Sequence, residues 1–264
     1  MKLGFIGCGN MAQAMMSGMI DAGLVSAEEV ISSDAFQPCL DGTREKLGIN
    51  ITSDNKEVAS KSEMVVLAVK PQFYKDVIEE IAPVINENTI IITIAPGQEL
   101  EKIEKLFGKK VKVVRTMPNT PAMVGEGMTA LCANSLVAED EKESVKEMIS
   151  GFSKAEYVPE YMMDAVVAVS GSSPAYVFMF IEALADGAVL LGMSRKEAYT
   201  FAAQSVMGSA KMVLDTGRHP ADLKDMVCSP AGTTIEAVQV LEEEGFRNAV
   251  MKAMIACADK AKKM

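Results

Sequence analysis

The chain has 264 residues, of which 49% are hydrophobic and 23% charged, a balance typical of a soluble globular protein with one or two domains. Its net charge of −10 excludes a protein that tracks a nucleic-acid backbone and disfavours docking on an acidic membrane. With five cysteines, no CxxC pair and a single histidine, we expect no metal site and reduced thiols in a cytoplasmic protein.

The first half of the chain alternates short apolar runs with helical patterns. The runs are rich in β-branched residues, and continuous apolar strands of this kind are typical of a parallel sheet covered by helices on both faces. We therefore expect an α/β fold with an N-terminal, Rossmann-like, doubly wound sheet. The predicted strands are 2–6, 30–33, 64–69, 89–94, 111–115 and 154–158.

The first predicted strand passes directly into the sequence GCGNMA, and a helical pattern follows to about Ala22. Gly7, Gly9 and Ala12 match the spacing G-x-G-x-x-A of a dinucleotide-binding turn. The first glycine allows the tight turn, the second lets a pyrophosphate approach the backbone, and the small third residue lets the helix lie close to the strand. A glycine turn without a ligand is the alternative, and the surrounding alternation of strands and helices favours the nucleotide.

Residues after the later strands are candidates to contact the same cofactor, because ligands bind at the carboxyl edge of such sheets. Asp34 closes the second predicted strand, where an acidic residue binds the adenine-ribose hydroxyls of NAD and disfavours NADP. An ordinary turn residue is the alternative there. Loops 68–71 and 95–97 face the same edge, and Lys70 either contacts phosphate or ribose or is simply solvated. Loop 115–121 either borders the active cleft or is a rigid connection.

The second half of the chain carries only helical patterns. We expect two domains, 1–160 for the dinucleotide and 161–264 as an all-α domain for substrate and dimerisation. Helix 174–191 is apolar nearly all round, so it must be buried, and a homodimer interface is the expected partner. The uncharged stretch 165–181 is interrupted by Ser-Gly-Ser-Ser-Pro, which predicts a buried loop and helix rather than a membrane span. The predicted helices are 174–191, 195–214, 221–227, 235–241 and 245–261.

The lack of candidate general bases narrows the range of reactions that the chain could catalyse. Oxidation of a hydroxyl needs a general base, yet the sole histidine, His219, lies in a predicted loop where a solvated side chain is the usual case. Helix 174–191 holds no lysine, unlike the comparable helix of β-hydroxyacid dehydrogenases. Reduction of a C=N bond needs mainly proximity and a hydrogen bond to nitrogen. The stretch CSPAGTTIEA at 228–237 supplies hydroxyls beside a helix N-terminus suited to a carboxylate, which predicts a small cyclic imino acid as substrate.

Over essentially its whole length the chain resembles the pyrroline-5-carboxylate reductase family. The resemblance implies reduction of 1-pyrroline-5-carboxylate to L-proline by NADPH or NADH, the last step of proline biosynthesis. It also implies a homodimer with intertwined helical halves, often assembled as a decamer of five dimers. The blocks that carry it are GFIGCGNMA at 4–12, AVKP at 68–71, MPNTPA at 117–122, SGSSPAYVFMFIEALADGA at 170–188 and LKDMVCSPAGTTIEAV at 223–238.

The resemblance also assigns the site residues. Thr234 would hydrogen-bond the ring nitrogen of the substrate and is the catalytic candidate. The residues implied for the substrate are Val227, Ser229, Gly232, Thr233 and Thr234. The residues implied for the cofactor are Gly7, Gly9, Asn10, Met11, Asn55, Ala68, Lys70, Pro71 and Gly97. Asp34 joins this set from its place at the end of the second predicted strand, not from the resemblance.

Two positions depart from the family pattern. Ala231 stands where a glycine is usual, and it would be strained if this position needs a positive φ. Pro96 replaces an alanine and removes one backbone donor near the nicotinamide. Two rival functions stay open: another imine or hydroxyacid reductase, in which Lys70 or Lys224 would be essential, and a redox sensor that binds NAD(P)H without turnover.

Overall fold

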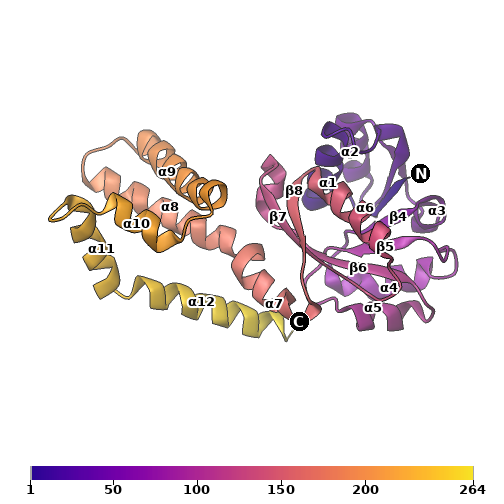
Figure 1. Cartoon of the computed structure of the whole chain (residues 1–264). Helices are drawn as coiled ribbons and strands as arrows, with labels where there is room; N and C mark the ends of the chain where they lie inside the picture. Colours follow the sequence, from indigo (N-terminus) through magenta and orange to yellow (C-terminus); the bar gives the residue numbers. More distant parts are fainter. Residues whose placement is uncertain (1, 264) are drawn as a thin grey trace. The chain divides into compact units, whose positions relative to one another are not determined.

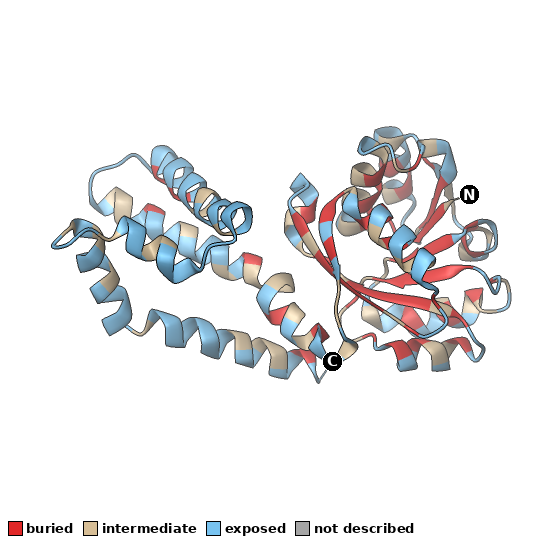
Figure 2. Cartoon of the chain, in the orientation of Figure 1, coloured by how far each residue is buried: buried red, intermediate tan, exposed pale blue. Residues whose placement is uncertain are grey.

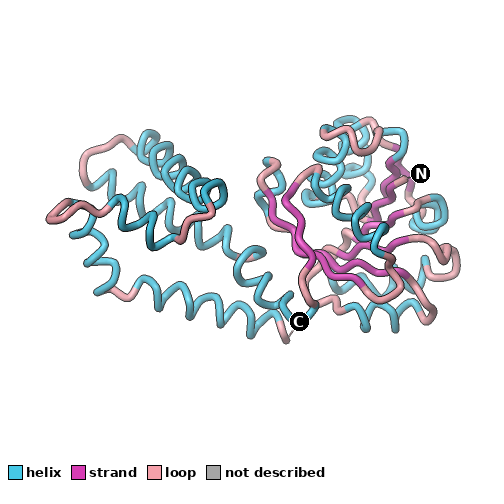
Figure 3. The backbone as a smooth tube through the Cα atoms, viewed as in Figure 1, coloured by secondary structure: helices cyan, strands magenta, loops and turns pink. Residues whose placement is uncertain are grey.

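The computed structural model describes residues 2–263, which form two compact units (Figure 1). One unit comprises the chain up to Ser172 together with the residues from Cys257 on, and the other comprises Ser173–Ala256. The first contains the sheet and the second is helical (Figure 3). The domain bounds 1–160 and 161–264 stay a prediction.

The first unit is built on an eight-stranded sheet with the order β3-β2-β1-β4-β5-β6-β7-β8. All neighbouring strands are parallel except β6 and β7, so the expected doubly wound α/β sheet is confirmed. The strands are β1 (Leu3–Ile6), β2 (Val30–Ser33), β3 (Asn50–Thr52), β4 (Met64–Leu67), β5 (Ile90–Thr93), β6 (Lys112–Met117), β7 (Gly127–Ala133) and β8 (Ser153–Tyr157).

Helices cover both faces of this sheet, which explains why its strands are apolar throughout. Successive side chains of a strand point to opposite faces, so Val66 of β4 joins one hydrophobic cluster while Val65 and Leu67 join the other. The buried residues accordingly concentrate in the strands (Figure 2). The helices of this unit are α1 (Asn10–Asp21), α2 (Gln37–Leu47), α3 (Asn55–Lys61), α4 (Tyr74–Ile81), α5 (Leu100–Phe107), α6 (Glu139–Ser150) and α7 (Met163–Val166).

Five further helices follow, and all five match the helices predicted from the sequence. Local signals set their ends: the Ser194 hydroxyl accepts the Glu197 N–H at the start of α9, and Gly217 closes α9 with a left-handed residue. A small cluster of Ala185, Ala198 and Ala202 packs α8 against α9. These helices are α8 (Ser173–Leu190), α9 (Arg195–Thr216), α10 (Pro220–Val227), α11 (Thr233–Glu243) and α12 (Phe246–Ala261).

The expectation of a loop before α8 is wrong. The Ser-Gly-Ser-Ser-Pro sequence is not a loop, because Val167–Gly171 forms a π-helical turn that leads into α8. By itself the chain leaves much of α8 exposed, as expected of a helix whose predicted partner is a second copy of the chain: Phe178 is 63% exposed and Met179 is 69% exposed, while an alanine-lined stripe meets α9. The helical stretch Glu160–Leu190 is long and apolar enough to cross a membrane, although length and composition alone are weak support for a span.

Candidate active site

The turn between β1 and α1 has the backbone that a pyrophosphate site needs. Gly7 has φ +101°, and a Cβ there would lie 2.6 Å from the Ala68 carbonyl oxygen, so only glycine fits. Gly9 caps α1 with extended backbone, and a Cβ there would meet no atom within 4 Å. Ala12 is buried in the core cluster beneath the turn. The space in front of Gly9 and the helix N-terminus is therefore open to an anion.

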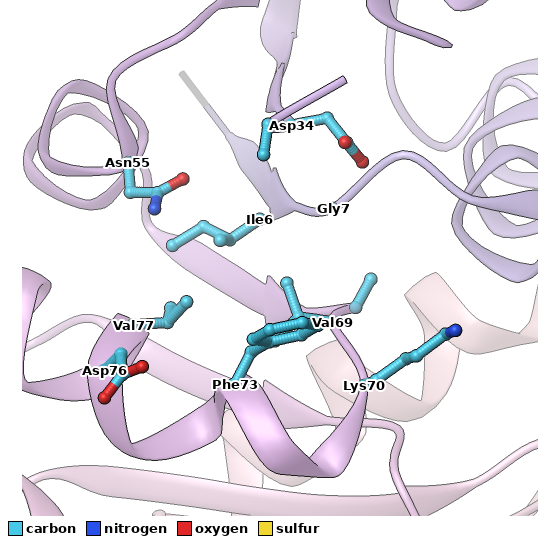
Figure 4. A pocket seen from close by; sticks show the side chains of 11 residues that line it. Ile6, Gly7, Asp34, Asn55, Val69, Lys70, Phe73, Asp76 and Val77 are labelled. Carbon is cyan, nitrogen blue, oxygen red and sulfur yellow. The ribbon is translucent and has the colours of Figure 1, made fainter.

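A cavity of about 410 Å³ lies at the carboxyl ends of β1, β2 and β4 (Figure 4). It brings together half of the ten residues predicted for the cofactor, which are Gly7, Asp34, Asn55, Ala68 and Lys70. Sequence reasoning missed the apolar floor made by Phe73 and Val77, whose side chains point into the cavity in Figure 4. Phe73 is 50% exposed, and an aromatic residue two positions after Pro71 of the Lys-Pro loop was a usable signal for it.

Main-chain donors hold the Asp34 carboxylate at the rim of this cavity. Its Oδ2 accepts the N–H of Cys8 at 2.8 Å, and its Oδ1 accepts the N–H of Phe36 at 2.9 Å. Asn55 is fixed by its neighbours as well, because Ser33 donates to its Oδ1 at 2.7 Å and its Nδ2 donates to Glu80 at 2.8 Å. Both candidate cofactor residues are therefore held in place by hydrogen bonds within the protein.

The remaining predicted cofactor residues lie outside the lining of this cavity. Asn10 is the first residue of α1, and Met11 packs against the core cluster. Pro71 is the first residue of a 3₁₀ turn, Pro71–Phe73, directly after Lys70. Gly97 follows β5 and has φ +70°, a conformation that favours glycine.

The side chain of Asn119 anchors the loop after β6 to two other segments of the chain. Its Oδ1 accepts the N–H of Met128 in β7 at 2.9 Å, and its Nδ2 lies 3.3 Å from the carbonyl oxygen and the hydroxyl of Ser170. These bonds tie the loop to the π-helical turn, which supports a rigid connection. Whether the loop borders a cleft stays a prediction.

In the helical unit, the predicted helix N-terminus is confirmed, because α11 begins at Thr233. Gly232 precedes it, and a Cβ on Gly232 would lie 2.3 Å from the Ser229 hydroxyl oxygen. Thr234 is half-buried in the first turn, and Val227 is exposed at the end of α10. The turn therefore brings Ser229, Gly232, Thr233 and Thr234 together, as an anion site at a helix N-terminus requires.

The backbone conformation shows that Ala231, which stands where the family usually has glycine, is strained. Ala231 has φ +56° and is the non-glycine residue with positive φ among the described residues. A side chain in this left-handed region costs about 1–2 kcal/mol. His219 serves a local role, since its Nδ1 accepts the N–H of Ala221 and caps α10.

Comparisons with known proteins agree on one family. The family "Pyrroline-5-carboxylate reductase dimerisation" matches residues 160–264, and "NADP oxidoreductase coenzyme F420-dependent" matches residues 2–97. The pyrroline-5-carboxylate reductase of Escherichia coli K12 is 48% identical over 263 residues, covering 100% of this chain and 98% of that protein. The chain belongs to the pyrroline-5-carboxylate reductase family.

Solved structures of this family have the same fold as the present chain. A pyrroline-5-carboxylate reductase from Coxiella burnetii superposes with a TM-score of 0.93 at 36% identity, over 99% of this chain and 97% of that one. The Plasmodium falciparum pyrroline carboxylate reductase with NADP bound gives a TM-score of 0.89 at 33% identity, with the same coverage.

Proposed function

We propose that this chain reduces 1-pyrroline-5-carboxylate to L-proline with NADH or NADPH. Full-length membership of the pyrroline-5-carboxylate reductase family carries the proposal, since the relative from Escherichia coli bears that name at 48% identity. The first unit has a glycine turn and a cavity that fit a dinucleotide, and the helical unit has a turn that fits a carboxylate. Both rivals would share the dinucleotide site, whereas the polar turn that fits a carboxylate is not expected of a sensor without turnover.

The residues of the first unit fit a dinucleotide on steric grounds. The open space in front of Gly9 admits a pyrophosphate, and its oxygens would accept hydrogen bonds from the main chain at Gly9, Asn10 and Met11. Phe73 and Val77 offer an apolar surface for a planar base. When bound, the reduced nicotinamide supplies the hydride that the C=N carbon accepts.

On the substrate side, the chain's own residues bind, orient and supply a hydrogen bond. The main chain from Ser229 to Thr233 would hold the carboxylate, because the first N–H groups of α11 have no partner within the helix. The Thr234 hydroxyl would hydrogen-bond the ring nitrogen, which becomes an amine as the carbon is reduced. A protonated imine is already electrophilic, so this scheme needs no lysine or histidine base.

We further propose that NADH is the preferred cofactor. Asp34 presents a carboxylate held by two main-chain donors at the rim of the cavity, and Asp76 lines the same cavity. Lys70 is the one cation among the lining residues. A ribose with two free hydroxyls can donate to Asp34, whereas a 2′-phosphate would be repelled.

We also propose a homodimer, able to assemble further to a decamer, in the cytoplasm and without a membrane partner. The dimerisation family match at 160–264 and the exposed apolar side chains of the helical unit support it. These side chains include Phe178, Met179, Phe201, Leu214 and Ile255. Light scattering on the purified protein measures the subunit number, and a monomer at micromolar concentration would contradict the proposal.

The test of the reaction follows absorbance loss from NADH and from NADPH in parallel, with 1-pyrroline-5-carboxylate as substrate. Rapid oxidation with formation of proline is expected. A folded protein that binds the cofactor and oxidises neither form would overturn the reaction and favour the sensor. Faster turnover of a different cyclic imine would favour the other reductase. A higher kcat/KM with NADPH than with NADH would refute the proposed preference.

A further inference from the structure

Three potential metal ligands meet behind the glycine turn. The Sγ atoms of Cys8 and Cys39 and a carboxylate oxygen of Asp34 all lie within 4.8 Å of one another. They come from three separate places: Cys8 from the turn after β1, Asp34 from the end of β2, and Cys39 from the first turn of α2. Cys8 is buried, while Cys39 and Asp34 are half-buried. The fold therefore brings together a cluster that no local sequence pattern predicts.

The donor set determines which cation fits. Two thiolates and one carboxylate are ligands for Zn²⁺ or Cd²⁺, which accept a tetrahedral site with water in the fourth position. Hard cations such as Mg²⁺ and Ca²⁺ require mainly oxygen ligands and would not use the two sulfurs. A thiophilic divalent cation is therefore the occupant that the cluster favours.

The hydrogen bonds around Cys39 tolerate removal of its thiol proton. Cys39 Sγ donates to the Cys8 carbonyl oxygen at 3.0 Å, and metal binding would remove this donor. The same carbonyl keeps a partner, because Gln13 Nε2 donates to it at 2.9 Å. Gln13 Nε2 also lies 3.7 Å from Cys39 Sγ, where it would donate to the thiolate as an outer-shell group.

Asp34 also retains capacity for a cation. Each of its two oxygens accepts one main-chain hydrogen bond, from Cys8 and from Phe36, and a carboxylate oxygen has a second lone pair. The same carboxylate lines the cofactor cavity. A cation on Asp34 would therefore compete with the ribose hydroxyls of a bound dinucleotide.

We propose that Cys8, Cys39 and Asp34 form a binding site for a thiophilic divalent cation, and that the cation and the dinucleotide exclude one another. Binding of one cation deprotonates two thiols, so two protons are released and no redox change occurs. The exclusion, but not the metal site itself, rests on the proposed cofactor site. Cation binding would thus inhibit the enzyme by competition with NADH.

Cadmium titration of the full chain in the reduced state tests the metal site without any assay of turnover. The Cd²⁺–thiolate charge-transfer absorbance in the ultraviolet is expected to rise to one equivalent. Cys39→Ser keeps a hydroxyl to donate to the Cys8 carbonyl but removes the soft ligand. The rise in absorbance should therefore disappear, or the cadmium affinity should fall at least tenfold. Cys257→Ser is the matched control, since Cys257 is also half-buried and hydrogen-bonded, to Ser172, and this variant should titrate as the wild type does.

Retention of the wild-type titration in Cys39→Ser would overturn the site. NADH binding, followed by its fluorescence, checks that the variant is folded, and Cys39→Ala serves in its place if the serine variant is not. Saturating NADH should weaken the cadmium affinity at least tenfold. An unchanged affinity with NADH bound, together with loss of the rise in absorbance in Cys39→Ser, would keep the metal site and refute the exclusion.

Discussion

Replacing Ala231 by glycine should stabilise the protein. At φ +56° the alanine Cβ costs about 1–2 kcal/mol, which glycine does not incur. Glycine in turn loses about 0.5–1 kcal/mol more conformational entropy on folding. The net expectation is a gain of roughly 0.5–1 kcal/mol, which for a chain of this size corresponds to a rise in Tm of about 2 °C.

Thermal unfolding at fixed protein concentration measures the change, with Ala210→Gly as the matched control. Ala210 is exposed within α9, where glycine should destabilise by about 1 kcal/mol. Opposite signs for the two variants are the expected result. A loss of stability in Ala231→Gly as large as that in Ala210→Gly would refute the argument from backbone strain.

Four further variants test other parts of the structure. Thr234→Ala should lose roughly ten- to hundredfold in kcat/KM with NADH binding unchanged, since one such hydrogen bond contributes about 1–3 kcal/mol, while Thr233→Ala, which keeps its backbone N–H, should lose less. Asp34→Ser should raise the kcat/KM ratio of NADPH to NADH, and a constant ratio would show that Asp34 does not contact the ribose. Gly18→Ala should destabilise by about 1–3 kcal/mol in urea unfolding, because its Cβ would lie 2.5 Å from Phe152 Cβ, whereas Gly42→Ala meets no atom within 4 Å and should stabilise. Burial raises the pKa of Cys132 from 9.0 to about 12, so the folded state keeps a proton that the unfolded chain loses above pH 9. The contribution of Cys132 to stability should therefore fall as pH rises above 9, and Cys132→Ala should show a smaller loss of stability than the wild type between pH 8 and pH 10.

Most of the sheet was predictable because its strands are apolar and β-branched. The two strands that were missed lack this signal. The first, β3, has three residues and begins with the exposed Asn50. The second, β7, has the sequence GMTALCA, in which only Thr129 is β-branched, and its antiparallel pairing with β6 supplies the stability that its composition does not predict.

The glycine turn was predictable in detail because its chemistry is local. Gly7 and Gly9 are recognised by spacing, and the structure gives each the steric role that the spacing implies. The floor of the cavity and the Cys8–Cys39 pair were not predicted, because residues distant in the chain meet only when the strands align. The sequence predicted strain at Ala231 only if that position has a positive φ, and the structure was needed to show that it has.

The exposed apolar surface of α8 has a consequence for how stability should be measured. If a second chain covers this surface, the folded state gains free energy by mass action, and the unfolding midpoint rises with protein concentration. A newly made chain would also need to meet its partner before that surface attracts other unfolded chains. Dilution below the dimer dissociation constant should therefore lower both activity and resistance to proteolysis.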